Sequence, residues 1–185
     1  MSDFDIDDIE RRMQKAVEAF RHELGGLRTG RASPSLLEHV TVHVYDSDMP
    51  LNQLASINVP EPRMLSVQVW DRGNVQAVEK AIRGSNLGLN PITEGALLRI
   101  PIPELNQQRR QELTKVAAQY AEHARVAVRN VRRDGMDRLK KMERDHELSE
   151  DDHKLWSEET QTQTDDAIKK IDELLAQKQK EIMHV

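Results

Sequence analysis

The chain has 185 residues, of which 37% are hydrophobic, 32% charged and 3% aromatic, with a formal net charge of −5. Because it contains no cysteine, disulfides and thiolate metal sites are excluded and a reducing cytoplasm is favoured. No apolar run approaches the roughly 18 residues of a membrane span, and the N-terminal MSDFDIDDIERR is acidic, unlike a secretory signal. We therefore expect a soluble, cytoplasmic protein of one compact domain or two small ones.

The first predicted element is a long amphipathic helix near the N-terminus. Apolar residues recur there at steps of three and four, which places them on one face of a helix: Ile6, Ile9, Met13, Ala16, Val17, Phe20, Leu24 and Leu27. Gly25 and Gly26 weaken its last turns, and Gly30 is expected to end it.

The next segment, residues 30–104, has a different pattern. Apolar and polar residues alternate over Val40–Val44 and over Leu65–Val69, which predicts half-buried strands. Asp46–Pro50 is expected to form a turn, and Pro60 with Pro62 to break the chain again.

A short helix is predicted over about Asn74–Arg83, with Gly84 as its stop. The sequence LNPITEGALLRIPIP, which starts at Leu89, then supplies one or two further short strands. Residues 30–104 therefore predict a small α/β domain.

The second long helix is expected from Asn106, its N-cap, to Arg144. Gly135 in its interior costs up to about 1 kcal/mol relative to alanine and is expected to loosen the helix locally. In the third helix, Ser149 precedes Asp152 by three residues, a capping-box spacing. Its apolar residues are Leu155, Ala167, Ile168, Ile171, Leu174, Leu175 and Ile182.

Three such helices must bury their apolar faces against one another. The predicted fold class is therefore α+β: an elongated antiparallel three-helix bundle of residues 1–29 and 105–185, with the α/β domain of residues 30–104 inserted. Two chain crossings join the parts, near residues 29–31 and 101–104. We expect a hinge at Thr29, Gly30, Arg31, Pro101, Ile102 and Pro103, with rigidly packed junctions as the alternative.

Charge is distributed unevenly over these elements. Residues 105–144 carry 11 Lys or Arg against 5 Asp or Glu, whereas residues 145–185 carry 5 against 12. On a helix, Arg125, Arg129 and Arg132 fall within about 60° of one another and about 100° from the centre of the apolar stripe. We call these three residues the arginine ridge and expect them to be exposed.

Such a ridge is most often a solvated face that pairs with acids of a neighbouring helix. Few acids lie between Arg125 and Arg133, however, and arginine rather than lysine is used, which suits bidentate contact with phosphate. Because the whole chain has 2 Trp, 2 Tyr and 2 Phe, bases of a single strand have few rings to stack on. Salt-dependent recognition of folded RNA through its phosphates and shape is the remaining nucleic-acid interpretation.

Enzyme motifs are missing from the sequence. It has no G-x-x-x-x-G-K-[ST] phosphate loop and no G-x-S-x-G elbow at Ser33 or Ser35. His39 with His43, and His146 with His153, could bind a metal by accident, but strand and cap positions explain them as well. We expect neither catalysis nor a cofactor.

Several stretches, taken together, resemble the bacterial ribosome recycling factor family: LRTGRASPSLL from Leu27, AVEKAI and LGLNP between Ala77 and Pro91, and ARVAVRNVRRD from Ala124, with SEDD and DAIKKID in support. The resemblance implies an L-shaped protein of a three-helix bundle and an inserted α/β domain. It also implies binding to the post-termination ribosome and, with elongation factor G and GTP hydrolysis, separation of the subunits.

The resemblance carries over to particular residues as well. The family's arginines that face large-subunit rRNA correspond to Arg28, Arg31, Arg110, Arg129 and Arg132, and Arg125 and Arg133 lie in the same matched stretch. The expected partners are the ribosome, through large-subunit rRNA, and elongation factor G, with no membrane; the protein itself is expected to be a monomer. The alternative is a helical structural or co-chaperone adaptor that binds an acidic protein partner, with an unrecognised hydrolase as a third possibility.

Overall fold

The computed structural model of the chain describes residues 4–184. It forms two compact units: the chain through Leu24 with residues 115–179, and residues 25–114 with the chain from Lys180 onward. The division expected from the sequence, at residues 29 and 105, stays a prediction. Each unit has its own core, and each is described separately.

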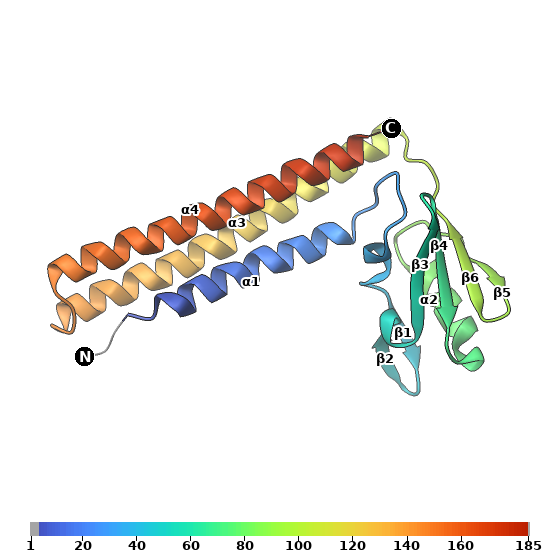
Figure 1. Cartoon of the computed structure of the whole chain (residues 1–185), viewed down its shortest axis with the longest axis horizontal. Coiled ribbons are helices and arrows are strands. Elements are labelled where there is room, and N and C mark those ends of the chain that lie inside the picture. The colour runs from blue at the N-terminus through green and yellow to red at the C-terminus, as the bar shows by residue number, and fades with distance from the viewer. Residues whose placement is uncertain (1–3, 185) are drawn as a thin grey trace. The chain divides into compact units, whose positions relative to one another are not determined.

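Three long helices make up the bundle and lie side by side: α1 (Ile6–Gly25), α3 (Gln107–Arg144) and α4 (Glu150–Met183) (Figure 1). Both predicted caps are confirmed. The Arg109 N–H donates to Asn106 Oδ1 at 2.7 Å, and the Asp152 N–H donates to Ser149 Oγ at 3.1 Å. These bonds satisfy N–H groups that the first helical turn leaves without a partner.

The contacts between α3 and α4 fix their relative direction. Glu143 near the end of α3 meets His153 near the start of α4, whereas Arg125 in the middle of α3 meets Asp172 far along α4. The two helices therefore run in opposite directions, and the predicted antiparallel bundle is confirmed. Phe4, just before α1, contacts Trp156 of α4 with their rings tilted at 53° and the ring centroids 5.9 Å apart.

Gly135 contradicts the expectation of a loosened helix, because it lies buried within an unbroken α3. A Cβ placed on it would lie 3.1 Å from Ile9 Cδ1 of α1 and 3.5 Å from Thr160 Cγ2 of α4. The missing side chain thus lets three helices approach closely at one point. The cost in helix propensity is offset by packing that the sequence pattern did not reveal.

The bundle core of α4 also differs from the predicted apolar stripe. Leu155 is 58% exposed, while Thr160 and Thr164 are buried. Their hydroxyls donate to the carbonyl oxygens of Trp156 and Thr160, each at 2.8 Å. Because the hydroxyls are satisfied within the helix itself, threonine methyl groups can pack in the core without a lost hydrogen bond.

Helix α1 ends at Gly25, earlier than the predicted stop at Gly30. Leu27 is buried nonetheless, outside the helix. A Cβ on Gly25 would lie 3.1 Å from Ser35 Cβ in the short 3-10 helix Pro34–Leu37, so the glycine permits a close passage of the chain. Two adjacent glycines favour this departure because they stabilise a helix least.

The second unit contains two antiparallel sheets. The first pairs β1 (Thr41–Val44) with β2 (Ser47–Pro50). The second has the strand order β3-β4-β6-β5 and consists of β3 (Ala55–Glu61), β4 (Met64–Val69), β5 (Ile92–Glu94) and β6 (Leu97–Pro101). Helix α2 (Val75–Gly84) ends where the sequence predicted, and its buried Val78 and Ile82 belong to the same core as the buried strand residues.

One prediction within this unit is wrong, and another is confirmed only in part. The segment Asp46–Pro50 is not a turn: the turn is Tyr45–Asp46, with positive φ angles of 52° and 58°, and β2 follows it at once. The predicted break at Pro60 and Pro62 is confirmed only at Pro62, which lies in the turn between β3 and β4. Pro60 lies within β3, at the edge of the sheet and beside a bulge. An edge strand tolerates proline because its outward N–H has no ladder partner to lose.

Candidate nucleic-acid interface

Arg125, Arg129, Arg132 and Arg133 project from the middle of α3, whose opposite face is buried in the bundle. The helix holds them at fixed spacing, so differences among them arise from their partners. These partners are two carboxylates for Arg125, one for Arg129 and a neutral amide for Arg132. For Arg133, no hydrogen bond or ion pair is found with any other residue between 4 and 184.

Arg125 is the most enclosed of the four, with 20% of its side chain exposed. Its Nε and NH2 donate to the same Asp172 oxygen, at 3.0 and 2.7 Å, and its NH1 donates to Glu122 at 3.2 Å. The hydrogen bonds that Arg125 donates to Asp172 raise the pKa of Arg125 above its ordinary value, with burial opposing and Glu122 assisting. Arg125 therefore differs from the expectation of an exposed ridge residue: it joins α3 to α4.

Arg129 is far more accessible, with half of its side chain exposed. Among residues 4–184 it forms one ion pair, with Glu122 Oε1 at 3.3 Å, and the other Glu122 oxygen accepts from Arg125. Exposed pairs of this kind are worth at most about 1 kcal/mol. A phosphate could displace Glu122 from Arg129 at low cost.

Arg132 is partly buried and donates its Nε–H to the side-chain oxygen of Gln161 in α4, at 2.7 Å. An amide accepts this bond without neutralising the guanidinium charge. Arg133 beside it is exposed. The strongest uncompensated positive charge on the ridge is therefore at its Arg132 end.

Three further arginines were predicted to face rRNA, and all lie in the second unit. Arg28 donates its NH2 to Pro103 O at 2.8 Å and its NH1 to Leu87 O at 3.4 Å. Burial lowers the pKa of Arg28, and the charge of Arg109 lowers it further. Arg31 is exposed, and Arg110 is partly buried with its Nε lacking a partner among the described residues.

The predicted hinge segments have distinct surroundings within the second unit. The Thr29 hydroxyl bonds to the backbone of Arg31, at 3.3 Å to both its N and its O. Ile102, by contrast, is buried in the core of the sheet unit, and its N–H donates to Arg63 O at 2.8 Å. Ile102 is thus bonded into the same core as the strands.

The sequence-based prediction missed the residues that hold the ridge: Glu122, Asp172 and Gln161. Glu122 had a local signal, since it stands three residues before Arg125 on the same helix. The two α4 residues had none, because their positions opposite α3 depend on the register between two helices.

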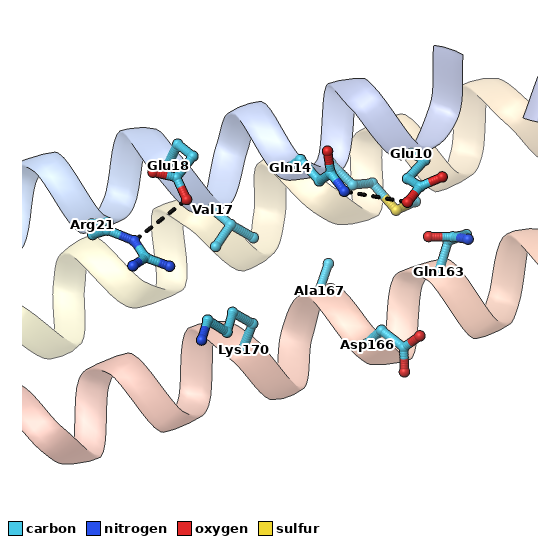
Figure 2. Close-up of a pocket in the computed structure, with 10 residues that line it drawn as sticks. Glu10, Gln14, Val17, Glu18, Arg21, Gln163, Asp166, Ala167 and Lys170 are labelled. Atoms are coloured by element: carbon cyan, nitrogen blue, oxygen red, sulfur yellow. Dashed lines mark hydrogen bonds and ion pairs between the residues drawn. The ribbon is translucent and has the colours of Figure 1, made fainter. Parts of the chain in front are cut away.

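Metal-ligating side chains do not cluster in the described part of the chain. No group of three His, Cys, Asp or Glu side chains gathers where it could hold a metal ion within residues 4–184. A groove of about 450 Å³ between α1 and α4 is lined by the apolar Met13, Val17 and Ala167 and by charged side chains of both signs. Figure 2 shows Val17 on α1 and Ala167 on α4 on its two sides. Its lining contains neither histidine nor hydroxyl side chains. No helix in the described part of the chain is long and apolar enough to cross a bilayer.

Comparison with known proteins gives a match over most of the chain. A family model described as ribosome recycling factor matches residues 20–183. The chain belongs to the ribosome recycling factor family. This is a family of translation factors rather than enzymes, in agreement with the prediction from the sequence.

Individual members of the family are similar over the full length. The ribosome-recycling factor of Rhodopseudomonas palustris (strain HaA2) is 65% identical over 182 residues, covering 98% of this chain and 97% of the relative. That of Rhodospirillum centenum is 64% identical over 185 residues, covering all of both chains.

Two solved structures of the family are similar to this chain. A solution structure of the ribosome recycling factor has a TM-score of 0.76 at 42% identity, with complete coverage of both chains. The other, at a TM-score of 0.68, 47% identity and 97% coverage of both, is described as models of the Thermus thermophilus ribosome recycling factor and Escherichia coli elongation factor G bound to the E. coli post-termination complex. Both the resemblance of the sequence and the predicted fold class are thereby confirmed.

Proposed function

We propose that this chain binds the post-termination ribosome through large-subunit rRNA and, with elongation factor G and GTP, separates the subunits in the cytoplasm. The observation that carries the proposal is identity of 64–65% to ribosome-recycling factors over nearly the whole chain. The structural neighbour bound to a post-termination complex with elongation factor G supports the choice of partners. The family match favours this function over the helical adaptor considered from the sequence.

The seven arginines proposed for rRNA contact divide into two groups by their surroundings. Arg129, Arg132, Arg133 and Arg31 are accessible or carry no carboxylate, so we assign them to direct contact with phosphates. Arg125 is paired with two carboxylates, and Arg28 and Arg110 are partly buried in the second unit, so we propose that each of them supports its own unit and does not contact phosphate directly. Arginine at the accessible positions offers a planar fork that suits phosphate oxygens.

Binding to purified bacterial large ribosomal subunits over a KCl series tests the RNA contact. Each phosphate contact contributes a slope of about 0.7–0.9 in the dependence of log K on log salt. Arg132→Gln is expected to weaken binding and lower the slope by roughly that amount. Arg138→Gln, an exposed arginine further along α3, is the matched control and should change both far less. Equal affinity and slope for Arg132→Gln and wild type would overturn the proposed contact.

Subunit separation is tested on 70S post-termination complexes with elongation factor G and GTP, followed by light scattering. The wild-type chain should split them only when both are present. If the 70S complexes are not split when this chain, elongation factor G and GTP are all supplied, the proposed function is refuted.

We further propose that the inserted domain of residues 30–104 moves during splitting, about a hinge at residues 29–31 and 101–104, and that the protein acts as a monomer. The burial of Ile102 supports a turning point after this residue rather than at it. A cysteine pair that crosslinks the inserted domain to the bundle should preserve ribosome binding and abolish splitting. Full splitting by the crosslinked protein would exclude the motion.

A further inference from the structure

The arginines of the ridge are held by two chemically different kinds of partner. Carboxylates of Asp172 and Glu122 occupy Arg125 on all three of its nitrogens, and Glu122 occupies one nitrogen of Arg129. Arg132 alone among the three is held by an uncharged group, the amide of Gln161. A carboxylate both orients an arginine and cancels its charge, whereas an amide orients it and leaves the charge available.

The amide of Gln161 is itself fixed in orientation. Its Nε2 donates to Asp165 Oδ1 one helical turn further along α4, at 2.8 Å, while its Oε1 accepts from Arg132 Nε at 2.7 Å. If the amide were reversed, its N–H groups would face the Arg132 Nε–H donor, and its oxygen would face the Asp165 carboxylate. Both hydrogen bonds would be lost, so Asp165 selects the amide orientation that holds Arg132. The three side chains form a chain of hydrogen bonds from Asp165 through Gln161 to Arg132.

We propose that Gln161 and Asp165 are positioning residues that present Arg132 to an rRNA phosphate, a role that rests on the proposed function. Because the bond to Gln161 uses Nε, both terminal nitrogens of Arg132 remain for a bidentate contact with phosphate oxygens. Arg132 is partly buried, so its stem is already ordered before RNA arrives. Ordering a long side chain in advance removes part of the entropy cost of binding.

Substitutions of similar size at residues 161 and 165 can separate the role of the amide from the role of side-chain packing. Gln161→Met keeps the length of the side chain but removes both hydrogen bonds. Gln161→Glu keeps an acceptor for Arg132 Nε but adds a charge that neutralises the guanidinium and repels both Asp165 and the RNA. Asp165→Asn keeps the shape and leaves the Gln161 amide free to reverse.

Binding of the full chain to purified bacterial large subunits over a KCl series gives the main readout. We expect Gln161→Met to weaken binding by roughly 3- to 10-fold with an unchanged salt slope, since Arg132 is still present but less ordered. Gln161→Glu should weaken binding by more than about 10-fold and lower the slope by about one contact. Asp165→Asn should produce a smaller loss than Gln161→Met.

Matched controls are available on the same helix. Gln163 donates to Glu159 in a similar amide–carboxylate bond but lines the groove between α1 and α4, as does Asp166 (Figure 2). Gln163→Met and Asp166→Asn therefore remove equivalent groups without touching an arginine, and both should bind subunits as wild type does. A loss equal to that of the Gln161 variants would mean that any change on α4 weakens binding, and would overturn the proposal.

A double-mutant cycle separates this proposal from the proposed function. Once Arg132→Gln is in place, Gln161→Met should have no further effect on affinity, because the group that it positions is gone. If Arg132→Gln weakens binding but Gln161→Met does so equally in both backgrounds, or not at all, the positioning role fails and the RNA contact stands. If Arg132→Gln itself changes nothing, the RNA contact fails.

A measurement without ribosomes checks the geometry directly. In ¹⁵N-labelled protein, the Arg132 Nε–H should exchange slowly with solvent in wild type and rapidly in Gln161→Met, while the Arg125 Nε–H stays slow in both. Rapid exchange of the Arg132 Nε–H in the wild-type protein would contradict the hydrogen bond on which the proposal depends.

Discussion

Arg125 of α3 and Asp172 of α4 are joined by two hydrogen bonds to a single carboxylate oxygen, at 3.0 Å from Nε and 2.7 Å from NH2. The pair links the two helices on the side of the bundle that carries the ridge. With 20% of the arginine and 54% of the carboxylate side chain exposed, its contribution to stability is modest.

Arg125→Met is therefore expected to act on stability rather than on RNA binding. Removing the ion pair should lower the free energy of unfolding by about 1 kcal/mol, while the aliphatic stem of methionine retains part of the packing. Urea unfolding followed by helical circular dichroism measures this, and Asp172→Asn should give a similar loss. A salt slope for subunit binding reduced by a full contact in Arg125→Met would show instead that Arg125 reaches a phosphate.

Gly135 and Ile9 are expected to be energetically coupled. In the wild type, Gly135→Ala gains helix propensity of up to about 1 kcal/mol but places a Cβ 3.1 Å from Ile9 Cδ1, and overpacking costs about 1–3 kcal/mol. We expect a net destabilisation. In an Ile9→Val background the contacting atom is absent, so the same substitution should become neutral or stabilising. Additive effects in this cycle, measured by urea unfolding, would contradict a packing role for the glycine.

Tyr45 and Asp71 make the stability of the second unit depend on pH in the acid range. The Gly73 N–H and then the Tyr45 hydroxyl, at 2.9 and 2.8 Å, lower the pKa of Asp71, with burial opposing slightly. Since the folded pKa lies below that of the unfolded chain, near 3.9, the stabilisation is present above about pH 4 and lost as the pH falls through the folded pKa.

Tyr45→Phe should therefore raise the pKa of Asp71 toward its ordinary value, which a ¹³C NMR titration of the carboxyl group would detect. The stability difference between variant and wild type should shrink as the pH is lowered below 4. The pKa of Glu79, lowered by hydrogen bonds from Arg83 and Thr93, is the internal control and should not move. An Asp71 pKa equal in both proteins would remove the hydroxyl as a cause.

Arg28 is expected to be a structural residue of the second unit. Its guanidinium donates to Pro103 O and Leu87 O, which lie on two different segments of the chain. Arg28→Met leaves both carbonyls without this donor, and hydrogen bonds from a charged group are worth about 1.5–3 kcal/mol. Faster amide hydrogen exchange around residues 86–89 and 102–105 should follow, with little change in the exchange of α4. Unchanged exchange around Leu87 would show that the bonds to Arg28 contribute nothing.

Local chemistry explains why some elements of the fold were predictable. Asn106 and Ser149 cap their helices through bonds to residues three positions on, and a sequence displays such short-range relationships directly. The buried Val67 and Val69 alternate with the less buried Ser66 and Gln68 in β4, so the strand was found. β3 was missed because proline at position 60 marks a break unless the strand is known to lie at an edge, and that position is set by the order of strands in the sheet.

The amino-acid sequence by itself determined the helices and their caps, the α/β segment between them, the family, and the concentration of arginine on one helix, because each depends on residues close together along the chain. Only the tertiary structure decided what each arginine does. The register of α4 against α3 places a carboxylate opposite Arg125 and an amide opposite Arg132, across 47 and 29 residues of sequence. Two guanidinium groups alike in sequence thereby become an interhelical link and an available charge.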